Sequence, residues 1–318
     1  MSEAFNMLSA VGNVDYSNCV AAVVVTYNRV DKLLQCINCL INQECAVPIV
    51  PLIIDNASTD GTREQLLSYI EDEKILYFNT GSNLGGAGGF NYGMDLAVRI
   101  GFKWQWIMDD DCFPSDTALQ ELIGFDASLN GDYGFLCSKV LWKDGSICLM
   151  NVPRRTMYRN LEYCDNESPE RIVMASFVSL FLRTERVVEF GLPIKDFFIW
   201  TDDWEFTRRI SRSMPCYVVP SSTVCHDSAS NIGANIVKSE EGRLNRFEHL
   251  YRNDVYLYRR EGLSGLLYEF VRLTSHSLRI LFQSSSKKLT RLSILVRGTV
   301  DGFHFNPPIE YPDLGSAE

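Results

Sequence analysis

The 318-residue sequence has no excess of basic charge and no long hydrophobic run. Lysine and arginine number 30 against 40 aspartates and glutamates, which gives a formal net charge of −10. We therefore expect no nucleic-acid partner, because binding to a phosphate backbone requires a surplus of cations. No apolar run approaches the ~20 residues that a helix needs to span a bilayer. The start, MSEAFNMLSA, lacks the pattern of a signal peptide, so we expect a cytoplasmic chain.

Several catalytic and metal-binding motifs are also missing. GxSxG and HExxH do not occur, which leaves no recognisable nucleophile with its base and no zincin helix. The ten cysteines include one CxxC spacing, Cys36 and Cys39, and it lies inside a helical pattern. We therefore expect reduced thiols in preference to a zinc site. The chain does have 46% apolar residues, enough to bury a sizeable core.

Strand and helix patterns alternate through the first 125 residues. Four apolar runs, each followed by a loop or a helical pattern, are typical of buried parallel strands: 20–27, 49–54, 75–79 and 104–111. This alternation predicts an α/β fold with a doubly wound sheet, whose ligands bind at the carboxyl ends of the strands.

Beyond the alternating part, the pattern is a less regular mixture of strands and then becomes helical. We expect a catalytic domain over 1–242 and a helical C-terminal region over 243–318. Within the catalytic domain, the nucleotide-binding half is expected at about 18–130 and the acceptor half at about 131–242.

Three aspartates, 109–111, follow the fourth apolar run. Adjacent carboxylates repel one another unless a cation neutralises them, and Mg²⁺ or Mn²⁺ prefers such oxygen ligands. Side chains alternate along an extended strand, so Asp109 and Asp111 are expected to point the same way and share a metal ion. A solvated acidic turn is the alternative interpretation. Their position at a strand end beside a glycine-rich segment favours a metal ion with a diphosphate.

The segment NTGSNLGGAGGFNYG (79–93) is rich in glycine, which lets the backbone approach a ligand closely. It lacks the GK[ST] of a phosphate-binding P-loop, and it follows the third strand instead of the first, unlike a dinucleotide fingerprint. An ordinary strand-to-helix turn is the alternative. The number of glycines favours a ligand-binding loop.

A second acidic segment, WTDDWEF (200–206), places two aspartates among aromatic residues. A carboxylate in a partly apolar site can have the raised pKa that suits a general base for a sugar hydroxyl. The alternative is favourable acidic charge at a helix N-terminus. His226, just past a predicted strand, is a candidate metal ligand, although a lone histidine is more often structural.

In order and spacing, VVVTYNR, IIDNASTDGT, NLGGAGGFNYG, MDDDC and WTDDWEF together resemble the inverting glycosyltransferase family two, with its GT-A fold. The resemblance covers residues 20–230. NxGGAGGFxxG with DDD and a later DDxEF is most similar to bacterial galactofuranosyltransferases, and rhamnosyltransferases are close. The 318 residues do not include the long flanking domains of the polymerising galactofuranosyltransferases, so we do not expect processive polymer synthesis.

The resemblance implies a role for each matching residue. Asp109, Asp111 and His226 would hold Mn²⁺ or Mg²⁺, and Asp203, with its neighbour Asp202, would act as the catalytic base. The implied donor-binding residues are Thr26, Tyr27, Asn28, Arg29, Asp55, Asn83, Gly85, Gly86 and Asp110, and the implied acceptor-binding residues are Trp200, Trp204 and Glu205.

The function that this resemblance implies is metal-dependent, inverting transfer of galactofuranose from UDP-galactofuranose to a saccharide acceptor. The acceptor is expected to be lipid-linked, for example to polyprenyl diphosphate, in the synthesis of a cell-surface polysaccharide such as O-antigen. A rhamnosyltransferase using dTDP-rhamnose and an inactive sugar-nucleotide-binding scaffold are the alternatives. A nucleotidyltransferase ranks last, because TYNRVDK after the first strand is not a triphosphate-binding loop.

Residues 263–297 combine apolar residues at helical spacing with six basic residues against Glu269 as the only acid. A basic amphipathic helix can lie in the interface of an anionic membrane. We therefore expect a peripheral enzyme at the inner face of the plasma membrane, with packing on the catalytic domain or a homo-oligomer as the alternative. The basic residues are Arg272, Arg279, Lys287, Lys288, Arg291 and Arg297.

Overall fold

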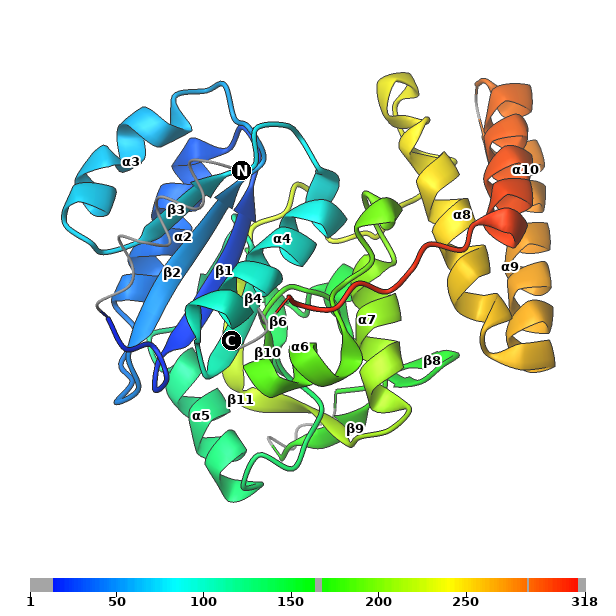
Figure 1. Cartoon of the computed structure of the whole chain (residues 1–318). Coiled ribbons are helices and arrows are strands. Elements are labelled where there is room, and N and C mark those ends of the chain that lie inside the picture. The colour runs from blue at the N-terminus through cyan, green and yellow to red at the C-terminus, as the bar shows by residue number, and fades with distance from the viewer. Residues whose placement is uncertain (1–13, 164–167, 285, 314–318) are drawn as a thin grey trace.

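The computed structural model describes residues 14–163, 168–284 and 286–313. The first ten residues, on which the expectation of no signal peptide rests, lie outside these ranges, and so does Cys164. In the first half of the chain strands and helices alternate as predicted (Figure 1). The elements are β1 (Val20–Thr26), α2 (Val30–Ile41), β2 (Ile49–Asp55), α3 (Thr62–Glu71), β3 (Leu76–Asn79), α4 (Gly85–Ile100), β4 (Trp104–Asp109), β5 (Cys112–Pro114) and α5 (Ala118–Ser128).

The second half adds strands to the central sheet, together with a separate sheet of two strands, and then turns helical. It contains β6 (Leu136–Trp142), η1 (Leu149–Asn151), β7 (Arg154–Thr156), β8 (Arg159–Asn160), β9 (Glu170–Ile172), β10 (Leu180–Arg183), α6 (Thr184–Phe190), η2 (Lys195–Phe197), α7 (Asp202–Ser211) and β11 (Cys216–His226). The helical end contains η3 (Glu241–Arg243), α8 (Arg246–Arg259), α9 (Gly262–Gln283) and α10 (Lys288–His304).

The central sheet is mixed, with the strand order β3-β2-β1-β4-β10-β6-β11-β5 along its main path. β1, β2, β3 and β4 are parallel, whereas β10 is antiparallel to both β4 and β6. The register pairs Thr26 with Asp55 and Val25 with Asp109, so β1, β2 and β4 end close to the same level. The predicted carboxyl edge, with its polar side chains, therefore exists.

Helices cover both faces of the sheet, which explains the continuous apolar character of β1. Val20 and Val24 pack with α2, α3 and α5 on one face, and Val23 and Val25 pack with α4, α6 and α7 on the other. All seven residues of β1 are buried. A strand buried on both faces leaves its end as the place for polar chemistry.

The C-terminal helices form a separate layer beside the sheet, at the far right of Figure 1. Helix α8 packs against both α9 and α10, around a core that includes Tyr251, Ile280 and Ile294. After α10 the chain returns to the α/β part, where Lys195 pairs with Glu310 at 2.6 Å. Among the described residues, none of the helices has the length and apolarity required of a membrane-spanning segment.

The glycine-rich segment differs from the expectation of a loop, because helix α4 begins at Gly85. A Cβ on Gly89 would lie 2.6 Å from Val25 Cγ1, so this glycine allows α4 to approach β1. Helix–sheet packing therefore accounts for part of the glycine content, and the loop itself is confined to residues 80–84.

Candidate active site

A cavity of about 940 Å³ opens at the carboxyl edge of the sheet. Its walls come from the ends of β1, β4 and β11, the start of α4 and α7, and one side of α8 and α9. Most of the residues implied by the sequence resemblance line it: Thr26, Tyr27, Arg29, Asn83, Gly85, Gly86, Asp109, Asp110, Asp111, Trp200, Asp202, Asp203, Trp204 and His226.

Three of the implied residues do not line this cavity. Asp55 is buried and accepts hydrogen bonds from Tyr77 Oη at 2.6 Å and from Asn79 Nδ2 at 3.1 Å. Asn28 accepts a hydrogen bond from the amide of Thr59, also outside the cavity. Glu205 forms a buried ion pair with Arg209 one turn along α7, at 2.9 Å. In the structure, these three side chains are engaged in supporting contacts.

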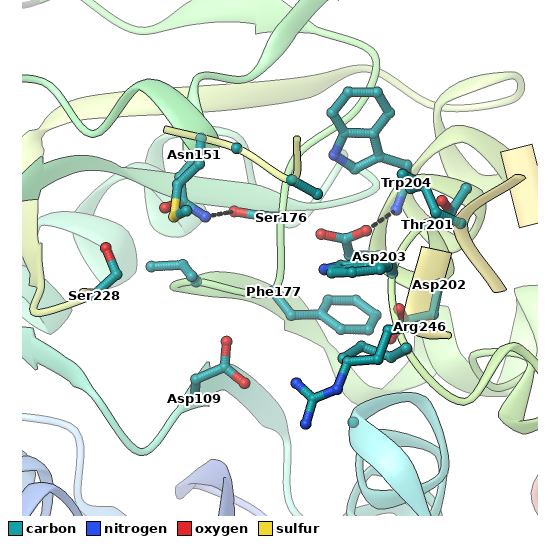
Figure 2. A pocket seen from close by; sticks show the side chains of 18 of the residues that line it. Asp109, Asn151, Ser176, Phe177, Thr201, Asp202, Asp203, Trp204, Ser228 and Arg246 are labelled. Carbon is teal, nitrogen blue, oxygen red and sulfur yellow. Dashed lines mark hydrogen bonds between the residues drawn. The ribbon is translucent and has the colours of Figure 1, made fainter. Parts of the chain in front are cut away.

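The aspartate triplet is a strand end followed by a turn, so the three side chains do not simply alternate. β4 ends at Asp109, whose carboxylate points into the cavity (Figure 2). Asp110 accepts a hydrogen bond from Thr26 Oγ1 at 2.8 Å, and Arg29 contacts both Asp110 and Asp111, at 3.2 and 2.8 Å. Arg29 therefore neutralises part of the negative charge at this edge.

Burial and mutual repulsion give these carboxylates different proton affinities. Burial, and then the charge of Asp111, raise the pKa of Asp109 to about 7. Burial raises the pKa of Asp110 to about 6, although Arg29 and Thr26 oppose the shift. Burial also acts on Asp111, but His226 and Arg29 outweigh it and lower its pKa. An added cation would favour the charged form of all three.

His226 lies at the end of β11 and is held in place by hydrogen bonds on both ring nitrogens. Nδ1 donates to Asn151 Oδ1 at 2.8 Å, and Nε2 lies 3.3 Å from Asp111 Oδ1. The amide of Asn151 in turn donates to Ser176 Oγ at 2.9 Å. Burial lowers the pKa of His226, but Asp111 and Cys148 outweigh it and raise the pKa to about 10.

The carboxylates of Asp109 and Asp111 and the imidazole of His226 fit a hard divalent ion in kind, since Mg²⁺ and Mn²⁺ take carboxylate oxygens and Mn²⁺ also accepts imidazole. As arranged, Asp111 is bonded to both Arg29 and His226. Across the part of the chain that the structure describes, no group of three or more His, Cys, Asp or Glu side chains is assembled as a metal site.

The second acidic pair faces the same cavity from the first turn of α7. Asp203 points its carboxylate inward beneath Trp204, whose backbone amide donates to it at 2.7 Å (Figure 2). Burial, followed by the charge of Asp202, raises the pKa of Asp203 well above its ordinary value. Burial raises the pKa of Asp202 to about 6. A carboxylate with a raised pKa that faces a cavity has the properties of a general base.

The backbone that delivers these aspartates is strained. Phe198, Trp200 and Thr201 all have positive φ angles, 64°, 65° and 69°, a conformation that costs non-glycine residues about 1–3 kcal/mol each. Gly85 lets this loop approach α4, because a Cβ there would lie 2.2 Å from the carbonyl oxygen of Phe198. The structure therefore holds an unfavourable backbone beside the candidate base.

Helix α8 holds the strained loop through two side chains. Asn253 Nδ2 donates to the carbonyls of Phe197, Ile199 and Trp200 at 3.1, 3.1 and 2.9 Å. Thr201 Oγ1 donates to Asp254 Oδ1 at 2.6 Å. Asn253 is fully buried, so no water replaces these contacts.

Sequence reasoning missed several residues that line the cavity, including Arg154, Asn151, Ser176, Arg246, Arg272 and Asp254. Figure 2 shows the guanidinium of Arg246 directed into the cavity. These residues come from η1, β7, a loop, α8 and α9, with no shared motif or spacing. Long-range packing brings them to the site, and for Arg246, Asp254 and Arg272 this is the packing of the C-terminal helices α8 and α9.

Comparison with known proteins agrees with the resemblance to glycosyltransferases that the sequence motifs indicate. Residues 21–137 match the family described as glycosyl transferase family 2. The chain is 26% identical to galactofuranosyltransferase GlfT1 of Mycolicibacterium smegmatis, over 79% of this chain and 87% of that protein. It is 27% identical to GlfT1 of Mycobacterium tuberculosis, over 78% and 84%.

Solved structures share the fold at low identity. Staphylococcus aureus TarS 1-349 matches with a TM-score of 0.53 and 16% identity, over 90% of this chain and 72% of that chain. GalNAc-T7 with UDP, GalNAc and Mn²⁺ matches with a TM-score of 0.54 and 14% identity, over 78% and 52%.

The mixed α/β fold of GT-A type is therefore confirmed. The family match and the homologous proteins, in addition to the fold, support a glycosyltransferase. More particularly, the chain contains a glycosyl transferase family 2 domain and is homologous to galactofuranosyltransferases, as the sequence resemblance predicts.

Proposed function

We propose that this protein transfers galactofuranose from UDP-galactofuranose to a hydroxyl of a saccharide acceptor, with inversion at the anomeric carbon. The observation that carries the proposal is the presence of two separate carboxylate groups on one cavity, Asp109–Asp111 and Asp202–Asp203. The homology to GlfT1 supports the sugar, and the fold shared with TarS in complex with UDP supports the nucleotide.

The strand-end side of the cavity is the proposed donor site. Thr26 and Arg29 fix Asp110 through hydrogen bonds, which keeps a carboxylate beside the expected ribose position. Asn83 accepts a hydrogen bond from the amide of Gly85 at 2.9 Å and so shapes the loop before α4. Gly86 lines the cavity and has no neighbour where a Cβ would stand, which leaves room for a ligand.

Asp109, Asp111 and His226 are the proposed ligands of Mn²⁺ or Mg²⁺. When bound, such an ion supplies neutralisation of the diphosphate leaving group. The raised pKa of the half-buried Asp109 supports this assignment, because desolvation and the charge of Asp111 outweigh the compensation that His226 and Arg29 provide.

Asp203 is the proposed base. Its carboxylate accepts the proton of the acceptor hydroxyl while that oxygen forms a bond to the anomeric carbon. The bond from this carbon to the diphosphate oxygen breaks at the same time, and UDP leaves with both electrons. A single displacement inverts the configuration. Trp200 and Trp204, which line the cavity, are the proposed contacts for the acceptor sugar.

A panel of nucleotide sugars tests the proposal and its alternatives. We expect UDP release with UDP-galactofuranose and a saccharide acceptor, and much less with UDP-glucose or UDP-galactopyranose. Selective turnover of dTDP-rhamnose would make the protein a rhamnosyltransferase. If the protein binds nucleotide sugars but turns over none of them, the result would favour the inactive scaffold.

We further propose a lipid-linked acceptor and peripheral attachment to the inner face of the plasma membrane. Helices α9 and α10 expose a series of large apolar side chains on their outer surface: Leu263, Leu267, Phe270, Val271, Leu278, Phe282, Leu289, Val296, Val300 and Phe303. Exposed apolar side chains that gather on two neighbouring helices indicate an interaction site.

Fewer basic side chains of these helices are free to contact lipid headgroups than the sequence pattern indicates. Arg272 is bound to Asp254 and Glu269, and Arg291 is buried against backbone carbonyls of the 236–239 segment. Neither cation can reach a lipid headgroup. Apolar burial is therefore the main proposed contribution to membrane binding, with salt-dependent attraction as the minor one.

Flotation with anionic vesicles tests this part of the proposal. The intact chain should float, and replacing Phe270 and Phe282 by glutamine should abolish flotation. Leu67→Gln, at an exposed position on α3, is the matched control and should float normally. A chain that stays at the bottom, or that forms a dimer sensitive to the same two replacements, would favour packing between copies.

A further inference from the structure

Arg154 is an arginine of the cavity without a counter-ion. Its backbone is fixed by hydrogen bonds from its amide to Met174 O at 2.8 Å and from the amide of Val173 to its own carbonyl at 2.7 Å. Its side chain is half-buried, and within the described chain it has neither an ion pair nor a side-chain hydrogen bond. Its Nε atom is buried without a partner.

Two of the other arginines at the cavity differ in this respect. Arg29 is paired with two aspartates, and Arg272 with Asp254 and Glu269. Their charges are therefore compensated inside the protein. Leaving a buried donor of a charged group unpaired costs free energy, so an uncompensated guanidinium at a cavity wall indicates a position for an external anion.

The guanidinium of Arg154 lies over the ring of Trp204, the residue that follows the candidate base Asp203. Its central carbon is 4.5 Å from the centre of that ring. The stacking fixes the guanidinium plane and leaves its edge to bind a ligand. An anion bound here would belong to the molecule that gives its proton to Asp203, which is the acceptor.

Aromatic rings complete the walls around this position. Tyr258 and Tyr268 line the cavity with their ring centres 4.8 Å apart, and Tyr158 stacks on Tyr268 at 4.9 Å. Rings of this kind bind the apolar faces of sugars or an alkyl chain. Arg154 adds a positive charge that can bind an anionic group of the same ligand. The combination fits a ligand that is both saccharide and anion.

We propose that Arg154 binds an anionic group of the acceptor, a phosphate or a carboxylate, and so selects charged acceptors over neutral ones. This inference rests on the proposed glycosyltransferase function and names the substrate class of the same site. A guanidinium binds both anions through two parallel N–H donors, a geometry that lysine does not provide.

Three matched synthetic acceptors test the proposal: a neutral octyl glycoside, the same sugar as its octyl phosphate diester, and the corresponding octyl uronic acid glycoside. For the wild-type protein, we expect a lower KM for at least one charged acceptor than for the neutral one. Arg154→Gln should raise the KM for that acceptor about 10- to 100-fold, in line with loss of a charge-assisted hydrogen bond. Arg154→Lys should restore only part of the affinity.

Arg155→Gln is the matched control, because Arg155 is the next residue, is exposed and does not line the cavity. It should leave all three KM values unchanged. The KM for the neutral acceptor should change much less in Arg154→Gln than the KM for the charged one, whereas a general loss of folding would affect all three acceptors alike. The phosphate and the uronic acid distinguish the two sources of the anion.

Calorimetric binding of the same acceptors without donor separates this proposal from the proposed function. If no nucleotide sugar is turned over, loss of binding of the charged acceptor in Arg154→Gln still supports an anion site. Equal binding of charged and neutral acceptors by the wild-type protein, or equal binding by Arg154→Gln and wild type, would overturn it.

Discussion

Replacing Asn253 by alanine should slow glycosyl transfer although this side chain touches no expected substrate atom. Its amide donates to three carbonyls of the loop that ends at Trp200, directly before the acidic pair. The alanine variant loses all three contacts in a site with no exposure to solvent. Without these hydrogen bonds, the strained backbone with its positive φ angles is less stable relative to a relaxed loop conformation.

The expected fall in kcat follows from two opposing free energies, the strain of the loop backbone and the hydrogen bonds that hold it. Strain at Phe198, Trp200 and Thr201 costs about 1–3 kcal/mol for each residue. Buried carbonyls left unpaired cost about 1–3 kcal/mol each, which is enough to let the loop relax toward an ordinary backbone. A displacement of the base by about 1 Å costs on the order of 10²-fold in rate, and we expect kcat of Asn253→Ala to fall by about that factor.

The assay measures kcat and KM for donor and acceptor together with thermal unfolding. We expect kcat to fall while the KM for the donor stays within about twofold, because the strand-end side of the cavity does not depend on Asn253. Asn38→Ala, on the outer side of α2, is a control that should match the wild type. An Asn253→Ala enzyme with normal kcat, or one that loses donor affinity as strongly as rate, would refute the reasoning.

The remaining predictions concern the two acidic groups. Asp203→Asn should reduce kcat by about 10²-fold or more and keep donor binding, measured by calorimetry, because only the proton acceptor is lost. EDTA should abolish transfer, and Mn²⁺ or Mg²⁺ should restore it; Asp111→Ala should not be restored, and full activity in EDTA would exclude the metal assignment. The activity should rise with pH over a range above the ordinary range of a carboxylate, because the pKa of the base is raised and only its ionised form acts. Asp202→Asn should move that rise to lower pH, since the charge of Asp202 raises the pKa of Asp203; an unchanged pH profile would show that the pair is not coupled.

The strands and the site edge could be predicted because their causes are local. A run such as VAAVVVT has to be buried on both faces, and the loop after it carries polar residues because ligands bind at the carboxyl end of such a strand. The acidic residues at 109–111 and 202–203 stand at element ends in the sequence and meet at one cavity in the structure. Their convergence follows from the topology of the parallel strands and from α7 packing on the same face of the sheet.

The remaining features depend on contacts that periodicity does not contain. Asp55 also stands at a strand end, yet Tyr77 and Asn79 take its carboxylate, because their own strand is its neighbour in the sheet. Glu205 is bound to Arg209 of the same helix, a spacing of four that the sequence does contain. No pattern in the sequence predicts a role for Arg154, because its distinguishing feature is the lack of a counter-ion among the residues that the structure describes.

The configuration of the product tests the central claim most directly. Purified protein is incubated with UDP-galactofuranose, a saccharide acceptor and Mn²⁺, and the anomeric configuration of the new linkage is determined by NMR. We expect a new glycosidic bond of configuration opposite to that of the donor, with one UDP released for each bond, and product formation by Asp203→Asn that is slower by about 10²-fold or more. A product that retains the configuration, or release of free galactose in place of transfer, would contradict it.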